Sequence, residues 1–430
     1  MAPDVDVVVV GAGFAGLSAA VRLARGGARV VVLEAKARLG GRATAFVDRD
    51  SGELVDNGQH VLLGCYTETF AFLREIGAIE HVALQPQLAV TMIDRAGRRS
   101  RLSCPPLPPP LHLLAGVLEW DALAWTDRLS VLGLGRAIRQ QLASPGETVE
   151  NWLIRNGQTA RIRELLWEPL ALAALNQPPD RAAAPMFARV LSQMFANDPR
   201  AAAIALPVEP LHEMYAEPAR RDIERHGGEV RTGVTARVVV EGDAVVAVEA
   251  AGERWGVSRV ISAVPWFAFG DLFGQVPPAL AGIADRARTL AASPIVTVDL
   301  WFDRPVVDEP FIGLPGRAMQ WVFDKGSYLS LVSSGADDIL RRTNAELIAL
   351  AHGELLDAMP TTRAARLVRG AVIREPRATF SLAPGQPPRP RTETPIRGLW
   401  LAGDWIDTGL PATIESAVAS GHRAANLVIG

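Results

Sequence analysis

The fold is decided by the stretch VDVVVVGAGFAG, residues 5–16. Its apolar run predicts a buried parallel strand, after which a helix should continue to about residue 25. Gly11 permits a tight turn, Gly13 lets the backbone approach a pyrophosphate, and Gly16 lets the helix pack closely on the strand. We therefore expect dinucleotide phosphates at the helix N-terminus, beside its first residues, Phe14 and Ala15.

A second apolar run, residues 29–33, ends at Glu34, which is followed by Ala35. Glu34 stands 23 residues after Gly11, where its carboxylate can accept hydrogen bonds from the ribose of an adenine nucleotide. A carboxylate suits a free 2′-hydroxyl and repels a 2′-phosphate. The βαβ unit therefore favours FAD or NAD over NADP.

The composition indicates a globular protein of two domains. With 430 residues, 49% of them hydrophobic, the chain can bury two cores, and its net charge of −3 gives no basis for nucleic-acid binding. Cys65 and Cys104 form no CxxC pair and the histidines lack metal-binding spacing, so we expect no metal. We find no signal-peptide pattern and no apolar run of the ~18 residues that span a bilayer, so we expect a cytoplasmic protein.

Motifs at both ends of the chain predict one cofactor domain assembled from separate segments. Residues 259–264 indicate another central strand, 399–404 a strand and turn, and 411–428 a closing helix with Pro411 in its first turn. The segments between them would form a substrate domain. We expect the cofactor domain over 1–75, 226–270 and 395–430, and the substrate domain over 76–225 and 271–394.

These motifs together resemble the flavin amine oxidase and phytoene desaturase superfamily. The set comprises the glycine triplet, Glu34, Arg38-x-Gly40-Gly41-Arg42, VISAVP at 260–265 and LAGD at 401–404. The resemblance implies an α/β fold: a discontinuous, Rossmann-like FAD-binding domain of three layers (ββα) with an inserted α+β substrate-binding domain. It narrows the cofactor to FAD. Neither cysteine lies in the C-terminal segment where relatives with a thioether link carry theirs, so we expect non-covalent binding.

The resemblance also assigns residues to the FAD site. Arg38 and Arg42 would lie along the pyrophosphate and ribityl side, and Asp404 would bind ribityl or pyrophosphate groups. The last helix would point its N-terminus at the flavin pyrimidine, where negative charge develops on reduction. Beyond the opening motif and Glu34, the residues expected at FAD are Arg38, Gly40, Gly41, Arg42, Gly58, Gln59, Gly403, Asp404, Pro411, Ala412 and Thr413.

Two stretches, 56–69 and 402–416, more closely resemble one branch of the superfamily, the bacterial hydroxysqualene dehydroxylases of squalene and hopanoid biosynthesis. This implies a long-chain isoprenoid substrate, hydroxysqualene, that loses its hydroxyl group and gains hydride from reduced flavin. The electron donor to the flavin stays unidentified. A carotenoid desaturase, which removes hydride, is the main alternative. A prenyl-lipid carrier of the same fold without enzymatic activity is a more distant one.

Loss of a hydroxyl group requires an acid, and three residues are candidates. His60 follows a turn at Gly58, in the segment that by resemblance passes the flavin; the alternative is a histidine that only orders this loop. Asp407 precedes the last helix and could instead serve as its N-cap. Glu415 lies in the first turn of that helix, where compensation of the helix dipole would explain it. Tyr66 is a weaker candidate for a polar contact to the flavin.

Residues 111–145 have the pattern of amphipathic helices, in which Arg128 and Arg136 alternate with leucines. Two interpretations stay open. The apolar face packs in the domain core, or it faces the inner side of the cytoplasmic membrane and admits a lipid-soluble substrate.

Overall fold

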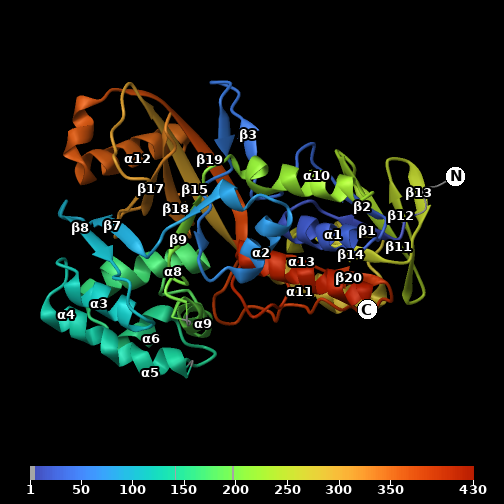
Figure 1. Ribbon diagram of the computed structural model, residues 1–430, viewed down its shortest axis with the longest axis horizontal. Coiled ribbons are helices and arrows are strands. Elements are labelled where there is room, and N and C mark those ends of the chain that lie inside the picture. The colour runs from blue at the N-terminus through green and yellow to red at the C-terminus, as the bar shows by residue number, and fades with distance from the viewer. Residues whose placement is uncertain (1–4, 141, 196–197) are drawn as a thin grey trace.

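The computed structural model describes residues 5–140, 142–195 and 198–430; the first four residues of the expected cofactor domain lie outside this part. Figure 1 shows three blocks. One contains the parallel sheet with helices α1 and α13, another contains a second sheet beside helix α12, and the third is a group of short helices, α3 to α6, away from the C-terminus.

The first sheet consists of five parallel strands in the order β10-β2-β1-β14-β20. Strands from the beginning, middle and end of the chain therefore lie side by side. β1 lies between β2 and β14, so the chain leaves it at a switch point of the strand order, where α/β sheets bind ligands. The bounds are β1 Val7–Val10, β2 Val30–Glu34, β10 Glu229–Thr232, β14 Val260–Ser262 and β20 Leu399–Leu401.

Alternate side chains of β1 pack into different layers, as the two faces of a strand require. Val7 and Val9 pack with helices α1 (Phe14–Arg25) and α13 (Ile414–Ile429). Val8 and Val10 pack with the antiparallel sheet of β11 (Ala236–Glu241), β12 (Ala244–Ala250) and β13 (Glu253–Gly256). The expected ββα layering and α/β fold class are confirmed. Helix α10, Glu217–Arg225, covers α1 (Figure 1).

The second sheet has the order β19-β15-β18-β17-β16-β7-β8, and its ladders are antiparallel except the β16–β7 pair. On β15, Val296 and Val298 pack with helix α12, Asn344–Ala358, whereas Ile295 and Thr297 point to the opposite face. The strands are β7 Ala89–Ile93, β8 Arg99–Ser103, β15 Ala292–Phe302, β16 Phe311–Gly313, β17 Trp321–Asp324, β18 Leu329–Ser334 and β19 Leu367–Phe380.

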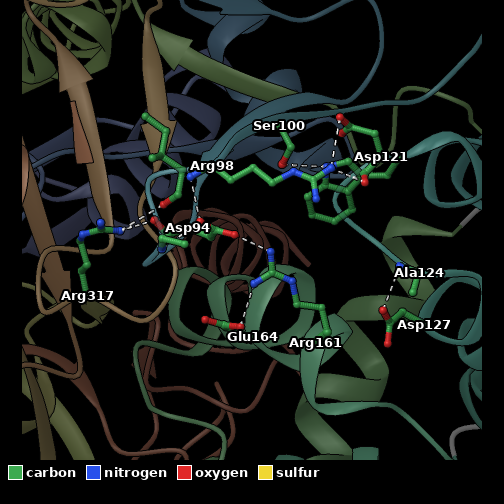
Figure 2. A network of polar contacts seen from close by, with 12 residues as sticks. Asp94, Arg98, Ser100, Asp121, Ala124, Asp127, Arg161, Glu164 and Arg317 are labelled. Atoms are coloured by element: carbon green, nitrogen blue, oxygen red, sulfur yellow. Dashed lines mark hydrogen bonds and ion pairs between the residues drawn. The ribbon is translucent and has the colours of Figure 1, made fainter. Parts of the chain in front are cut away.

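Short helices form the third block, and polar contacts fasten it to the second sheet. Figure 2 shows Asp94, in the β7–β8 turn, receiving hydrogen bonds from Arg161 of α7 and, at its carbonyl, from Arg317. Arg98 donates to the carbonyl of Asp121 at 2.6 Å. The helices are α3 Leu111–Glu119, α4 Trp125–Ser130, α5 Leu134–Arg139, α6 Val149–Arg155, α7 Ala160–Ile162, α8 Glu168–Leu175 and α9 Ala184–Met194.

Two smaller antiparallel sheets and one further helix complete the part that bears on the site. The hairpin of β3 and β4 packs Phe46 and Val55 against Trp301 and Tyr328 of the second sheet. Helix α2 follows Tyr66 and packs beside α13. The bounds are β3 Ala45–Val47, β4 Leu54–Asp56, β5 Leu62–Leu63, β6 Val82–Leu84, β9 Ile204–Pro207 and α2 Thr67–Glu75.

The last helix begins later than the proline signal indicates. Its first residue is Ile414, because the hydroxyl of Thr413 accepts the Ser416 amide at 3.2 Å and so makes Thr413 the N-cap. Pro411 lies in the turn before it, where its carbonyl accepts the Thr413 amide. Its expected place in the first turn of the helix is therefore wrong.

Candidate active site

One cavity of about 1260 Å³ lies between the two main sheets. Pockets for a single ligand typically enclose about 300–1,000 Å³, so this volume suits two ligands side by side. We call one part the nucleotide half, lined by residues 10–15, 33–36, 40–43, 234–236, 263–265, 403–404 and 412–414. We call the other part the apolar half; residues between 88 and 204 and between 295 and 334 line it.

The glycine turn leaves space where a pyrophosphate would lie. Gly11 has a φ of +107°, and a Cβ on Gly16 would lie 1.8 Å from the Gly11 carbonyl oxygen, so the helix touches the turn. A Cβ on Gly13 would meet nothing within 4 Å. Gly13 lines the cavity and is the N-cap of α1 without a side-chain cap. The first amides of α1 thus keep the capacity to bind an anion.

Glu34 lines the nucleotide half at the end of β2. Its Oε2 accepts the Ala12 amide at 2.8 Å and its Oε1 accepts the Lys36 amide at 2.9 Å, which fixes the carboxylate in place. Each oxygen retains a further lone pair, so the carboxylate can still accept ribose hydroxyls. This arrangement fits an adenine dinucleotide with a free 2′-hydroxyl.

Arg42 and Asp404 join the two ends of the chain at the cavity wall. The guanidinium contacts the Asp404 carboxylate at 2.6 Å and donates to the Ala378 carbonyl at 2.8 Å. Burial works against the charge of Arg42, but Asp404 outweighs it and the pKa of Arg42 is raised. The pair is charged and held in place without a ligand, ready to face polar groups of a bound cofactor.

Fifteen of the eighteen residues expected at the cofactor line the cavity, and Gly16, Arg38 and Pro411 do not. Gly16 instead packs against the Gly11 carbonyl. Arg38 is exposed, with its guanidinium 5.2 Å from the centre of the Phe46 ring, which removes it from the expected pyrophosphate side. The residues that do line it are Gly11, Gly13, Phe14, Ala15, Glu34, Ala35, Gly40, Gly41, Arg42, Gly58, Gln59, Gly403, Asp404, Ala412 and Thr413.

Of the three candidate acids, the structure brings only His60 to the cavity. Its Nδ1 is buried and has no hydrogen-bond partner in the described part of the chain. Burial lowers the pKa of His60 most; Asp56 and a backbone hydrogen bond at Gly58 raise it, whereas Lys325 and Arg42 lower it. A proton placed on this imidazole is therefore readily given up.

Asp407 and Glu415 form contacts outside the cavity. Asp407 is exposed, accepts the Gly409 amide at 3.2 Å and lies 3.5 Å from Arg389. Glu415 is buried and accepts the amides of Glu68 and Thr69 at 3.0 and 2.9 Å, so it caps helix α2 rather than its own helix. Both are corrections to the expected catalytic set, because neither carboxylate reaches the cavity.

The apolar half is the chemical opposite of the nucleotide half. Among its described lining residues none is charged. Its lining includes Cys104, and burial raises the pKa of that thiol to about 11, so it is protonated and unreactive near neutrality. The side chains come from both the helical block and the second sheet, and include Leu88, Val90, Met92, Leu113, Val117, Ile138, Leu166, Trp167, Leu170, Phe195, Phe311, Trp321, Phe323 and Val332.

Sequence reasoning missed the polar residues that the second sheet places beside the His60 loop. Lys325 contacts Asp56 and Gln59, and Thr297 lies beneath Gly58. The sequence held one signal, since Lys325 is one of only two lysines in the chain. Contacts between residues more than 200 positions apart cannot otherwise be recognised from a single sequence.

The described residues offer neither a candidate metal site nor a candidate membrane span. No three or more His, Cys, Asp or Glu residues in that part of the chain are placed to hold a metal ion. Nor does any helix there combine the length and apolarity needed to cross a membrane.

Comparison with known proteins gives a family match along nearly the whole chain. Residues 14–429 match the model of flavin-containing amine oxidoreductases. A hydroxysqualene dehydroxylase from Rhodopseudomonas palustris is 31% identical, with 98% of each chain covered. A 15-cis-phytoene desaturase from an Oncidium hybrid cultivar is 25% identical, covering 99% of this chain and 78% of the relative.

Solved structures show the same fold. An oxidoreductase from Methanosarcina mazei aligns with a TM-score of 0.77 at 19% identity, covering 98% of this chain and all of the other. A putrescine oxidase triple mutant aligns with a TM-score of 0.72, also at 19% identity, covering 99% and 98% of the two chains. At this identity the likeness concerns the fold alone.

Proposed function

The chain belongs to the family of flavin-containing amine oxidoreductases and is an FAD-dependent oxidoreductase; from this premise we propose that it converts hydroxysqualene to squalene. The apolar half of the cavity carries the proposal, because it is continuous with the nucleotide half and its uncharged lining suits a hydrocarbon chain. Each buried CH₂ contributes about 0.8 kcal/mol, so a thirty-carbon isoprenoid needs no charged anchor. The hydroxysqualene dehydroxylase relatives support the same substrate.

The residues of the nucleotide half fit FAD. The open space at Gly13 and the free amides of α1 would receive the pyrophosphate, and Glu34 would receive the adenosine ribose. Arg42 and Asp404 would lie beside the polar linker. FAD, when bound in its two-electron reduced form, supplies a hydride equivalent. Cys104 is kept protonated by burial, which supports non-covalent binding.

His60 would supply the proton. In the proposed reaction the carbon–oxygen bond of the allylic alcohol breaks, a carbon–hydrogen bond forms at the same carbon, and the hydroxyl leaves as water. His60 is the one expected acid that lines the cavity, and its buried Nδ1 has no partner in the described chain. Its lowered pKa makes its protonated form a strong proton donor, at the cost of a small protonated fraction near neutrality.

The test is product analysis under anaerobic conditions. FAD-loaded protein, chemically reduced, is incubated with hydroxysqualene, and the lipids are identified by mass spectrometry. We expect squalene from the native protein and at least about tenfold less from His60→Gln with FAD content unchanged. Absence of squalene from flavin-loaded native protein would refute the function. Full activity of His60→Gln would refute the role of His60 alone.

The desaturase alternative uses the same fold with the opposite electron flow, and the phytoene desaturase relatives support it at lower identity. Removal of hydride from an alkene chain leaves no hydroxyl group to protonate, so it gives the buried His60 no evident purpose. Oxidised, FAD-loaded protein incubated with phytoene decides between them. We expect no reduction of the flavin.

We further propose that helices α3 to α5 dock on a lipid bilayer. Large apolar side chains are exposed along this segment: Trp125 is 66% exposed and Leu129, four residues on, is 54% exposed. Leu132 is 56% exposed and also lines the apolar half, so the exposed surface continues into the cavity. A bilayer that holds the lipid substrate is the partner that this continuity suits.

Vesicle co-sedimentation tests this docking. The double variant Trp125→Glu with Leu129→Glu should bind anionic phospholipid vesicles at least about fivefold less than the native protein. In the native protein both apolar side chains would enter the bilayer, and in the variant charges replace them. The control is Val368→Glu, since Val368 is 57% exposed and lies on β19 of the second sheet, outside the proposed docking helices. Equal binding of the double variant and the native protein would contradict the proposal.

A further inference from the structure

The loop that carries His60 is held by a lysine from the second sheet. Lys325 follows β17, and its Nζ lies 2.8 Å from Asp56 Oδ2 and 3.1 Å from Gln59 Oε1. Gln59 in turn donates through Nε2 to the His60 carbonyl at 2.9 Å. One ammonium group therefore connects Asp56, the last residue of β4, with Gln59, the residue before His60.

The contact is buried and leaves the loop little freedom. The side chains of Lys325 and Asp56 are 18% and 9% exposed. The other oxygen of Asp56 accepts the Leu211 amide at 2.9 Å. Gly58, with a φ of +84°, passes so close to β15 that a Cβ there would lie 3.2 Å from the Thr297 hydroxyl. The ion pair thus holds the loop at Asp56, and the second sheet packs against it at Gly58.

The choice of lysine is itself informative. Of the 44 lysine and arginine residues in the chain, Lys36 and Lys325 are the only lysines. An ammonium is a compact charge with three donors, which suits a carboxylate and an amide oxygen on different sides. A guanidinium is planar and presents its donors as a fork. The contacts of Lys325 with Asp56 and Gln59 use this compact geometry.

Lys325 and Asp56 also act on the imidazole in opposite directions. Lys325 lowers the pKa of His60 and Asp56 raises it, beside the larger effect of burial. Arg42 adds to the lowering. The other titratable or charged groups that face this cluster are Asp48, Glu53, Asp299 and Tyr328.

We propose that the Lys325–Asp56 ion pair is a positioning device for His60, which fixes the orientation of the loop and of the charges around the imidazole. The chemical purpose of this device rests on the proposed function. The device itself does not, because its effect on the imidazole exists without substrate. Neither Lys325 nor Asp56 is expected to touch the substrate.

The experiment follows the His60 titration in FAD-loaded protein by NMR of ¹³C-labelled histidine, with the resonance assigned by its loss in His60→Gln. Lys325→Met removes a positive charge and should raise the His60 pKa; Asp56→Asn removes a negative charge and should lower it. Each shift should be about 0.5–1 pH unit, as for one charge about 10 Å away in a partly screened site. A merely structural contact would not move the pKa in opposite directions.

The matched control is Arg161→Met, which removes a partly buried ion pair with Asp94, a group that is not among those acting on His60. It should leave the His60 titration unchanged. Lys325→Gln, which keeps a donor without the charge, replaces Lys325→Met if that variant does not fold. Shifts in the same direction for the lysine and Asp56 variants, or no shift in either, would overturn the proposal.

Turnover gives a second readout. With hydroxysqualene, Lys325→Met should lower kcat about tenfold and leave KM within about twofold, because orientation of the acid changes and the apolar half does not. An unchanged kcat would contradict the positioning role. If native protein forms no squalene, the proposed function fails, while the NMR titrations still decide whether the ion pair controls His60.

Discussion

Gly13 and Gly16 lie at the start of helix α1 but serve different purposes. A Cβ on Gly16 would collide with the Gly11 carbonyl oxygen at 1.8 Å, whereas one on Gly13 would enter open space in the cavity. The backbone contact at Gly16 belongs to the folded protein itself. The space at Gly13 has meaning only when a cofactor fills it.

The two glycines therefore predict different defects. Gly16→Ala should destabilise the protein by about 1–3 kcal/mol through overpacking and lower its FAD content. Gly13→Ala should cost less than about 1 kcal/mol without FAD and weaken FAD binding at least about tenfold. Thermal unfolding with and without added FAD separates the two effects. Equal behaviour of the variants would contradict this division.

Asp299 is a buried carboxyl group whose protonation should limit stability. Burial raises its pKa from 3.8 to about 7, and its Oδ1 has no partner among the described residues. Between those pH values the folded protein holds a proton that the unfolded chain releases. Its contribution to stability is therefore fully present below about pH 4 and is lost as the pH rises through about 7.

Asp299→Asn should remove this dependence. At about pH 8 the variant should be more stable than the native protein by on the order of 1–4 kcal/mol, and near pH 4 the two should be equal. Urea unfolding at both pH values measures this. Asp48→Asn is the control with opposite sign, because hydrogen bonds and Arg369 lower the pKa of Asp48 despite its burial penalty. A constant difference at all pH values would refute the assignment.

At this scale the sequence predicted residues whose role depends on local spacing. Gly11, Gly13, Glu34 and Gly403–Asp404 line the cavity. Asp407 and Glu415 failed as candidate acids because the direction of a side chain depends on what packs beside it. The sequence cannot indicate that α2 would present its amides to Glu415.

Helix α2 shows how one element is completed by another. Its N-cap residue, Tyr66, offers no side-chain cap, and the amides of Glu68 and Thr69 instead bind the carboxylate of Glu415 in the first turn of α13. A buried carboxylate at a helix N-terminus also interacts favourably with the helix dipole. The contact aligns the segment after His60 with the helix that closes the FAD domain.

Glu415→Gln should therefore act on stability and not on chemistry. We expect a loss of about 1–2 kcal/mol in unfolding free energy, the usual range for a lost cap. The pH dependence of squalene formation should be that of the native protein. Glu346→Gln, in the exposed capping box of α12, is the control and should cost less. A changed pH profile in Glu415→Gln would return it to the list of candidate acids.

Elements were predictable where a periodic pattern and its boundary signals agree. The strands of the opening unit and helix α1 lie within a few residues of their expected places. Helix α12 begins at Asn344, where Thr343 and Glu346 form a capping box that the sequence pattern signals. The fourteen-residue strand β19 was not predicted, since most of its residues are partly exposed and its pattern lacks an apolar stripe.

In the whole molecule, segments from both ends of the sequence build one site. Arg42 and Asp404 stand 362 positions apart and form an ion pair at 2.6 Å beside the cavity. The five parallel strands fall within 1–75, 226–270 and 395–430, which we propose as the FAD-binding domain. We propose 76–225 and 271–394 as the substrate domain, although α10 packs on α1.

Binding of FAD should consequently protect both ends of the chain together. At about one hundred times its dissociation constant a ligand adds about 2.7 kcal/mol of stability. Hydrogen exchange should slow in residues 10–16 and 401–414 by the same factor. In Arg42→Met the C-terminal protection should be at least about fivefold weaker, whereas Arg397→Met, which breaks an exposed ion pair with Asp243, should change neither. Independent protection of the two ends in the native protein would contradict a shared site.

The central claim is that one cavity brings reduced FAD and an allylic alcohol together for hydride transfer. It is tested most directly by a single anaerobic turnover in D₂O, in which the transferable hydrogen of the reduced flavin exchanges with solvent before hydroxysqualene is added. The account predicts one squalene per flavin, with one deuterium at the carbon that carried the hydroxyl group. Squalene without deuterium, or a flavin that stays reduced in the presence of substrate, would contradict it.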